Sequence, residues 1–323
     1  MILVQVYVDD IIFGSNNNSM CEEFVATMQE EFEMSMMGEL TYFLVLQVKQ
    51  LKHGTILSQS KYYFDMLKKF KMEDCKEATT LIATNCLMDV DEIGQQVDST
   101  KHRRLISYLL YLTDSRLDIQ FGVCLCARFQ SNPKESHFKA AKRILKYLKG
   151  TTNIGLWSPN ESTLFLVIFS DFDYLGCKLD SKSTSGTCHL LGLRLISWNS
   201  KKQACVALST TEAKYITVRH VCAQSIWLKH QLIDYGVKLY MVPLYCDNTN
   251  AINITKNPIQ HSKTKHIKIR HNFKRDHIQK GEIEIKFVKT ENQLADLFTK
   301  PLARDRFNKL RTELGVLDMK NVR

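Results

Sequence analysis

Hydrophobic residues alternate with polar ones at the start of the chain. Val4, Val6 and Val8 recur at every second position, and the apolar run IIFGS follows two adjacent carboxylates, Asp9 and Asp10. Period-two alternation on both sides of a short polar break is typical of a β-hairpin. The pattern therefore predicts a hairpin over residues 4–15, with the acidic pair near its turn.

A helix and a second hairpin are predicted next. The segment NNNSMCEEFVATMQEEF predicts a helix capped by Ser19, with Glu22 three positions later completing a capping box. Residues 42–62 predict a hairpin that turns at His53 and Gly54, and KYYFDMLKKF predicts a helix after it. The polar, irregular sequence of residues 79–101 is then typical of a linker.

Helical periodicity returns after this linker, most clearly in SHFKAAKRILKYLKG. Apolar side chains share one face of that predicted helix, which ends at Gly150. The other face is basic and carries Lys139, Lys142, Arg143, Lys146 and Lys149. Two interpretations stay open for the basic face: a solvated surface, which we favour, and a contact with nucleic acid.

From about residue 164 the pattern changes to short apolar strands. LFLVIFSD, TSGTCHLLG and LRLISWNSK predict strands, residues 210–235 predict a long helix, and VPLYCD and EIEIKFVKT predict two more strands. Hairpin-like strands followed by alternating helices and strands favour a mixed sheet with flanking helices. The predicted fold class is α+β, with regions at residues 1–78, 79–160 (linker and helical connection) and 161–323 (the mixed sheet).

The composition is that of an ordinary globular protein, with 44% hydrophobic and 24% charged residues in 323. The apolar run LFLVIF has about a third of the ~20 residues that a membrane span needs, so we expect no membrane association. The first residues do not have the pattern of a signal peptide, so we expect an intracellular chain, in the cytoplasm or nucleus. The ten cysteines form no C-x-x-C pair, which favours reduced thiols and no zinc site.

The net charge of +10 is concentrated in residues 256–289, which hold ten Lys or Arg against three Asp or Glu. A basic segment of this kind favours a polyanionic partner. The predicted nucleic-acid contacts in it are Lys265, Lys268, Arg270, Lys274 and Arg275. His261, His266 and His271 lie at intervals of five, which fits neither one helical face nor the usual zinc spacings. We expect these histidines to pack or to contact a nucleic-acid backbone.

Three carboxylates in the second half of the chain follow predicted strands or open a helix: Asp171, Asp247 and Asp296. Carboxylates at the ends of neighbouring strands can hold two divalent cations about 3.5–4 Å apart for phosphoryl chemistry. Each residue taken singly is more often a strand-end or cap residue. Together they favour a site for Mg²⁺ or Mn²⁺.

Eight motifs in chain order carry a family resemblance: YVDDIIFGS, MSMMGELTYFL, SKSTSGT, ISWNSKKQ, ALSTTEAKY, YCDNTNAI, QHSKTKHI and NQLADLFTKPL. They are similar, nearly end to end, to copia-type retrotransposon Pol polyproteins. The resemblance implies the end of a reverse transcriptase palm with its thumb in residues 1–78, a helical connection, and an RNase H-like domain in residues 161–323. The implied partners are a primer-template and an RNA–DNA hybrid, in a virus-like-particle context; no oligomeric state is implied.

The resemblance also implies roles for the acidic residues. Asp9 and Asp10 match metal-binding carboxylates of the polymerase. In the family, a third catalytic Asp and the fingers region of the polymerase precede this hairpin. We therefore expect a half-site that binds Mg²⁺ weakly and supports no polymerase activity. Asp171, Asp247 and Asp296, with a Glu from the long helix, match the RNase H carboxylates around two metal ions.

The long helix reads EAKY where the family reads EAEY, so position 212 or 214 must supply that Glu. These positions point about 200° apart on a helix, and only one can face the sheet. The stripe through position 214 holds Val218, Val221, Ser225, Leu228 and Leu232. Lys214 therefore stands where the carboxylate is expected, and Glu212 could replace it only if the start of the helix were shifted.

A lysine ammonium among three carboxylates offsets part of their repulsion and replaces charge that Mg²⁺ would supply. We expect a folded but impaired RNase H centre. Val45, Phe172 and Leu175 stand where the family usually has Gly or small residues, which points the same way. The alternatives are a non-catalytic nucleic-acid-binding remnant, an active magnesium-dependent RNase H that cuts RNA in hybrids, and a pseudogene product without function.

Overall fold

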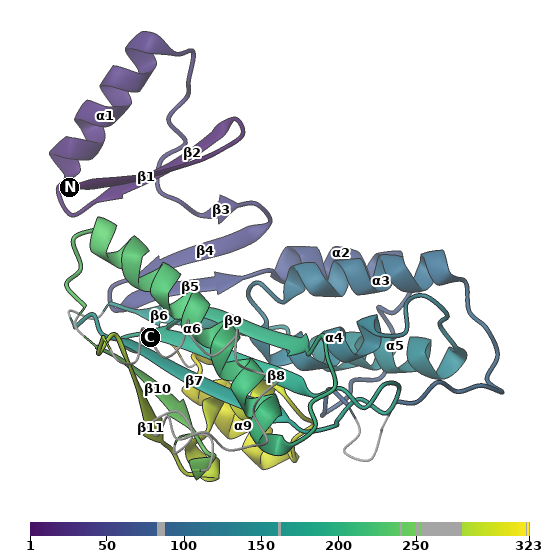
Figure 1. Ribbon diagram of the computed structural model, residues 1–323. Coiled ribbons are helices and arrows are strands. Elements are labelled where there is room, and N and C mark those ends of the chain that lie inside the picture. The colour runs from purple at the N-terminus through teal and green to yellow at the C-terminus, as the bar shows by residue number, and fades with distance from the viewer. Residues whose placement is uncertain are drawn as a thin grey trace.

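The computed structural model describes residues 1–82, 88–160, 163–239, 241–249, 252, 280–320 and 322, apart from the side chains of residues 211, 215, 219 and 220. The described chain forms two sheets, a group of helices beside them and an N-terminal hairpin with its own helix (Figure 1). The predicted α+β class is confirmed. No helix in the described part of the chain is long and apolar enough to cross a membrane.

The N-terminal unit consists of β1 (Ile2–Tyr7), β2 (Asp10–Ser15) and α1 (Asn18–Glu31). Strands β1 and β2 pair antiparallel up to Tyr7 and Asp10, which confirms the predicted hairpin. The prediction that Ser19 caps the helix was wrong. The cap is Asn17, because its side-chain oxygen accepts the Ser19 backbone N–H at 3.0 Å. None of residues 1–40, all of them described, is buried.

An antiparallel sheet lies beside this unit, with strand order β12-β6-β5-β4-β3. Its strands are β3 (Tyr42–Phe43), β4 (Leu46–Leu51), β5 (Gly54–Ser58), β6 (Ile154–Pro159) and β12 (Val316–Asp318). The predicted hairpin with its turn at His53 is β4–β5. Strands β6 and β12 were not predicted. The sheet takes strands from each of the three predicted regions, whose boundaries stay a prediction.

Helices pack together at one end of the molecule (Figure 1). They are α2 (Ser60–Lys69), α3 (Ser99–Leu112), α4 (Gln120–Ala127) and α5 (Glu135–Lys149). The short helix η1 (Leu117–Ile119) precedes α4. Their shared core includes the fully buried Leu105, Leu109 and Ile144. Apolar burial on one face of each helix, rather than helix propensity, is what stabilises short helices such as these.

The mixed sheet has the strand order β11-β10-β7-β8-β9. Its strands are β7 (Leu166–Asp173), β8 (Thr184–Leu191), β9 (Arg194–Lys202), β10 (Val242–Cys246) and β11 (Ile283–Phe287). Strands β7, β8 and β9 pair antiparallel, whereas β10 runs parallel to both β7 and β11. The predicted mixed sheet is therefore confirmed.

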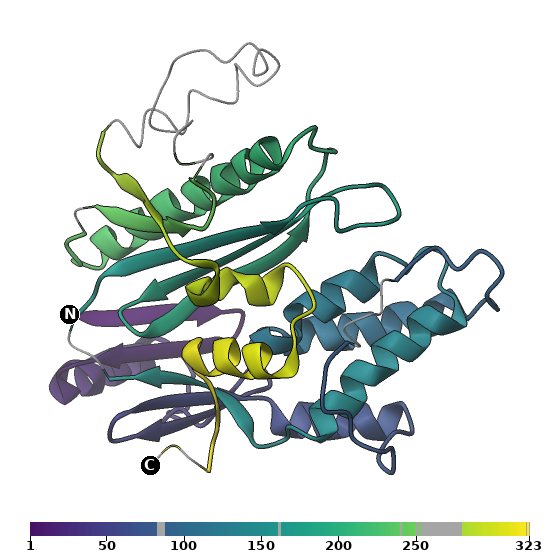
Figure 2. The same cartoon turned by 90° about the horizontal axis from the view of Figure 1, so that it is seen from below.

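Helices cover both faces of the mixed sheet (Figure 2). The long helix α6 (Thr210–Asp234) packs on one face, where Val218, Val221 and Leu228 meet the buried side chains of β7, β10 and β11. The other face meets η3 (Thr290–Asn292), η4 (Leu294–Phe298) and α9 (Arg304–Glu313), which lie between the two sheets. Residues from both sheets share this core, so the sheets form one packed body.

Candidate functional site

Asp171 lies near the end of β7 and is only 2% exposed. Thr299 Oγ1 donates to its Oδ2 at 2.6 Å, and Lys300 Nζ lies 3.6 Å from the same oxygen. Burial raises the pKa of Asp171, and the cations Lys300 and Lys214 oppose that rise. Gly186 lies opposite Asp171 on β8 and allows η4 to pack closely against that strand. A Cβ at this position would lie 2.8 Å from the Ala295 carbonyl oxygen of η4.

Asp296 lies in η4, beside Asp171, and is 1% exposed. Its two carboxylate oxygens meet two different cations. Lys300 Nζ lies 2.9 Å from Oδ1, and Arg306 Nη2 donates to Oδ2 at 2.5 Å. Lys300 follows Asp296 by one helical turn and therefore contacts both buried aspartates.

Lys214 is fully buried under α6. Its Nζ donates to the Ser170 carbonyl oxygen at 2.9 Å and to Asp247 Oδ1 at 3.2 Å. The Phe172 ring centroid lies 5.1 Å from the same Nζ. The predicted stripe is also buried: Val218, Val221, Ser225, Leu228 and Leu232. The prediction that position 214 faces the sheet is thereby confirmed.

Glu212 has a structural role at the start of α6. Its carboxylate accepts the Leu208 backbone N–H at 2.7 Å, while Ser209 Oγ accepts the Glu212 backbone N–H at 3.1 Å. These reciprocal bonds resemble a capping box, which satisfies backbone donors that the helix itself cannot. Glu212 thus stabilises the helix terminus and does not contact Asp171, Asp247 or Asp296 in this arrangement.

The carboxylates at this centre contact cationic side chains. Each of the carboxylates Asp171, Asp247 and Asp296 contacts an internal cation, and the cations are Lys214, Lys300 and Arg306. Among the described residues, no group of three or more His, Cys, Asp or Glu side chains is arranged to hold a metal ion. Two divalent cations would compete with these side-chain cations for the same oxygens.

Lys300, Arg306 and Thr299 were missed by the sequence analysis. Lys300 and Thr299 stand within the NQLADLFTKPL motif, so their spacing from Asp296 was the available signal. Arg306 carried no such signal, because it reaches Asp296 from a different helix. The sequence shows which residues are charged, whereas the pairing follows from how η4 and α9 pack.

Asp9 and Asp10 stand apart from this centre, at the tip of the β1–β2 hairpin (Figure 1). Both are exposed, and no ion pair is found for either within the described part of the chain. Val8, in the same turn, has a φ of 51°, a left-handed conformation that is costly for a β-branched residue. The tip therefore presents two adjacent carboxylates on a strained turn.

The basic face predicted on α5 is used in part by the fold itself. Arg143 donates to Thr80 Oγ1, and Lys149 Nζ donates to the carbonyl oxygens of Glu73 and Cys75. Lys142 lies over the Phe138 ring, and Lys139 is exposed and lies 3.9 Å from Glu135. Lys146 is half-buried. The remaining predicted contacts lie outside the described residues: Lys265, Lys268, Arg270, Lys274, Arg275, His261, His266 and His271.

Comparison with known proteins gives one match to the start of the chain and others over nearly all of it. The reverse transcriptase (RNA-dependent DNA polymerase) family matches residues 1–84, the part that carries the Asp9–Asp10 hairpin. The retrovirus-related Pol polyprotein from transposon RE1 of Arabidopsis thaliana is 36% identical over 98% of this chain. The chain spans 22% of the length of that relative. It belongs to the copia-type retrotransposon Pol polyproteins.

Two solved structures overlay in part on the fold. The foamy viral protease-reverse transcriptase in complex with dsDNA covers 89% of this chain and 55% of its own, with 14% identity and a TM-score of 0.48. LC11-RNase H1, isolated from compost, covers 45% of this chain and 96% of its own, with 12% identity and a TM-score of 0.33.

Proposed function

We propose that this Pol segment binds nucleic acid, as an RNA–DNA hybrid or a primer-template, and that its RNase H-like centre hydrolyses RNA poorly. The observation that carries the proposal is the position of Lys214. Its ammonium lies buried between the Ser170 carbonyl and Asp247, so it neutralises a carboxylate that a divalent ion would need. The Phe172 ring packs over the same ammonium and further covers it.

A hydrolysis assay on a labelled RNA–DNA hybrid tests the catalytic part. We expect the parent chain to cut the hybrid negligibly in Mg²⁺ or Mn²⁺. Lys214→Glu should bring cation-dependent cutting at least about tenfold above the parent, because one more carboxylate replaces the internal cation. Lys49→Glu is the matched control: it makes the same charge change at an exposed position of β4 and should leave cutting at the parent level.

Robust cation-dependent cutting by the parent chain would overturn the proposal and favour an active RNase H. Cutting restored equally by Lys214→Glu and Lys49→Glu would show that net charge, rather than position 214, controls activity. Circular dichroism of each variant establishes that the chains compared are folded.

Binding is tested separately, in chelator. The net charge of +10 favours contact with phosphates, and that contribution releases counterions and therefore weakens as salt rises. We expect hybrid binding in EDTA that falls steadily between low and physiological salt. Binding that requires Mg²⁺ would contradict a role independent of the metal.

We extend the proposal to the hairpin and to location. Asp9 and Asp10 are exposed and belong to no group of three His, Cys, Asp or Glu side chains among the described residues, so we expect weak metal binding at the hairpin and no primer extension. We place its nucleic-acid partners in the cytoplasm or nucleus, in the virus-like-particle context of the family.

A further inference from the structure

Lys300 is held in the acidic centre of Asp171, Asp247 and Asp296 by charge alone. Its Nζ lies 2.9 Å from Asp296 Oδ1 and 3.6 Å from Asp171 Oδ2. The first contact does not have hydrogen-bond geometry, because Asp296 Oδ1 has no hydrogen-bond partner among the described residues. The second contact is too long for a hydrogen bond. The ammonium is therefore attracted to both carboxylates without being fixed to either.

The other two cations of the centre are fixed more firmly. Lys214 is fully buried, and its ammonium donates two hydrogen bonds. Arg306 donates a hydrogen bond to Asp296 Oδ2 at 2.5 Å. Lys300 makes no such bond within the described structure, and its side chain is 34% exposed. Of the three cations, Lys300 can therefore turn out to solvent at the lowest cost.

The Lys300 ammonium also covers the oxygens that it contacts. Asp171 and Asp296 are both buried, and the ammonium lies directly against Asp296 Oδ1. This oxygen becomes open to a ligand only when the ammonium moves away. A buried carboxylate left without its counter-ion is strongly unfavourable, so another cation has to take the place of the ammonium. Carboxylate oxygens are preferred ligands of Mg²⁺ and Mn²⁺.

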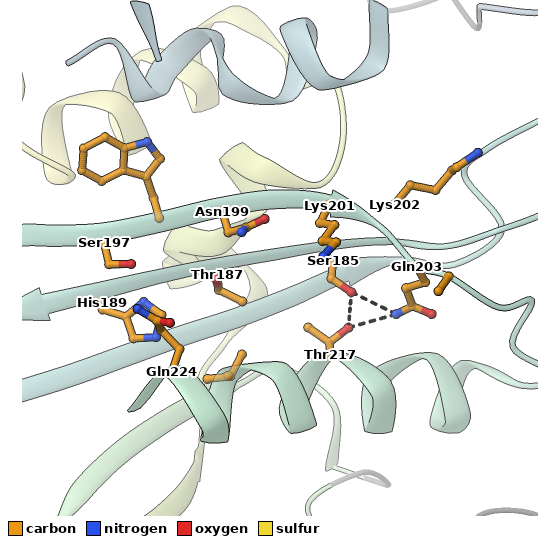
Figure 3. Close-up of a pocket in the computed structure, with 13 residues that line it drawn as sticks. Ser185, Thr187, His189, Ser197, Asn199, Lys201, Lys202, Gln203, Thr217 and Gln224 are labelled. Atoms are coloured by element: carbon orange, nitrogen blue, oxygen red, sulfur yellow. Dashed lines mark hydrogen bonds between the residues drawn. The ribbon is translucent and has the colours of Figure 1, made fainter. Parts of the chain in front are cut away.

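A polar groove of about 320 Å³ between α6 and strands β8 and β9 offers no comparable site for a cation (Figure 3). No Asp or Glu is among the described side chains that line it. The His189 imidazole in the groove is buried, and burial lowers the pKa of this ring to about 4. The groove therefore does not compete with the acidic centre for Mg²⁺ or Mn²⁺.

We infer that Lys300 is an exchangeable counter-ion, whose ammonium must leave Asp171 and Asp296 before a divalent cation can bind their oxygens. Lys214 stays in place beside Asp247, so the centre takes one divalent cation rather than two. The inference rests on the proposed function only in treating this centre as a cation site. It adds that cation entry depends on the outward movement of one side chain.

Amine acetylation of the full parent chain, read by mass spectrometry, tests the exchange directly. If Lys300 is turned outward in at most about a tenth of the molecules before a cation binds, saturating Mn²⁺ should raise its acetylation rate by about five- to tenfold. Potassium chloride at the same ionic strength should raise it much less, because screening acts weakly on buried charges. An equal rise in potassium chloride would show screening instead of exchange and would overturn the inference.

Lys202 is the matched control lysine, and it lies on β9 (Figure 3). Its Nζ lies 2.8 Å from Asp180 Oδ2, and its side chain is 31% exposed, close to the value for Lys300. Asp180 does not belong to the acidic centre, so Mn²⁺ should leave the acetylation rate of Lys202 unchanged. The inference is overturned if both lysines respond equally, or if Lys300 responds at no concentration of Mn²⁺.

Lys300→Met tests the same idea by removing the ammonium while keeping most of the side-chain length. This variant should bind Mn²⁺ at least about tenfold more tightly than the parent, because no ammonium has to leave first. The loss of the free-ion signal in electron paramagnetic resonance measures the affinity, and one tightly bound ion per chain is expected. Lys202→Met should bind Mn²⁺ as the parent does. Two tightly bound ions, or an affinity equal to that of the parent, would contradict the inference.

The inference and the proposed function can fail separately. The acetylation experiment contains no nucleic acid and uses the parent chain, so it stands even if Lys300→Met does not fold. A Lys300 that ignores Mn²⁺ overturns the inference and leaves the proposed function in place. If the parent chain cuts the hybrid robustly while Lys300 responds to Mn²⁺ as expected, the proposed function fails and the exchange is supported.

Discussion

Val45 is held in a conformation that its side chain disfavours. Its φ is +68° and that of Leu44 is +45°, in the turn between β3 and β4. A left-handed backbone costs an ordinary residue roughly 1–2 kcal/mol, and more when the side chain is β-branched. Leu175 has a φ of +54° and stands at another position where the family usually has a small residue. Two of the three departures noted in the sequence, Val45 and Leu175, therefore coincide with local strain.

Val45→Gly should consequently raise the free energy of unfolding by about 1 kcal/mol, because glycine adopts this conformation without the steric cost. Urea denaturation measures the change. Val48→Gly is the control: Val48 lies inside β4 and its φ is not positive, so the same substitution should destabilise the chain there. A loss of stability at position 45 equal to that at position 48 would rule out strain as the explanation.

His189 should also make the stability depend on pH. Its folded pKa is about 4, below the ordinary 6.5, so between these values the unfolded chain binds a proton that the folded chain does not. Its contribution is therefore present above pH 6.5 and is lost as the pH falls towards 4, by about 3 kcal/mol for a shift of this size. Urea unfolding at pH 7 and pH 4.5 measures this loss.

His189→Phe should lose about 2 kcal/mol less than the parent between those two pH values, since it has no group to protonate at this position. Other titrating groups affect both chains alike, so the difference between the chains reports His189. Parallel pH profiles would refute the assignment.

The sequence predicted the position of Lys214 because a helix has a fixed angular period, and the apolar residues four and seven positions on mark the buried face. Lys300 and Arg306 could not be predicted in the same way. Lys300 pairs with Asp296 four residues earlier, a local spacing that the sequence analysis did not use, whereas the pairing of Arg306 with Asp296 depends on the side-by-side packing of η4 and α9, which no local period describes. The groove was also invisible in the sequence, because it results from the spacing between α6 and the sheet.

At the scale of elements, long segments with a clear period were predicted well and short ones were not. Helix α6 runs from Thr210 to Asp234, close to the predicted residues 210–235. Strand β12 has only three residues, and β6, although it has six, pairs with strands far away in the chain, so neither was found from its local pattern. For α1, the cap is Asn17 and not Ser19. Both residue types are good N-caps, so the sequence does not show which of the two caps the helix.

A buried ion pair joins several elements. Arg116 donates to both oxygens of Asp118 at 2.9 and 2.8 Å, and the Tyr147 hydroxyl of α5 donates to Asp118 at 2.7 Å. Arg311 of α9 donates to that hydroxyl at 3.1 Å. Although burial opposes it, Arg116 keeps the pKa of Asp118 below its ordinary value. These hydrogen bonds thus connect η1 and α5 to α9.

Asp118→Ala should therefore destabilise the chain by about 3–5 kcal/mol, because it leaves the buried Arg116 charge without its partner. Replacing both members, with Arg116→Met and Asp118→Leu, should recover most of that loss. The measurement is urea unfolding, with Lys139→Ala at an exposed ion pair as a control that should change stability by less than about 0.5 kcal/mol. A double variant as unstable as Asp118→Ala would contradict this account.

At the scale of the molecule, the described chain contains two parts that differ in how much of their surface is buried. Strand β6 pairs with β5 on one side and with β12 on the other, so segments from both halves of the chain complete one sheet. That sheet shares its core with the mixed sheet. The N-terminal unit has no buried residue in positions 1–40, and its hairpin is a two-stranded sheet with several exposed apolar side chains, including Val6 and Val8.

Hydrogen exchange read by mass spectrometry should separate these parts. Amides of β1, β2 and α1 should exchange through local opening, since a hairpin with little buried surface is marginally stable in water. Amides of β5, β6 and β12 should exchange together and much more slowly, because opening any one of them disrupts a core shared by both sheets. Protection in residues 1–40 equal to that of β6 would show that the hairpin is stabilised by contacts that its exposure does not reveal.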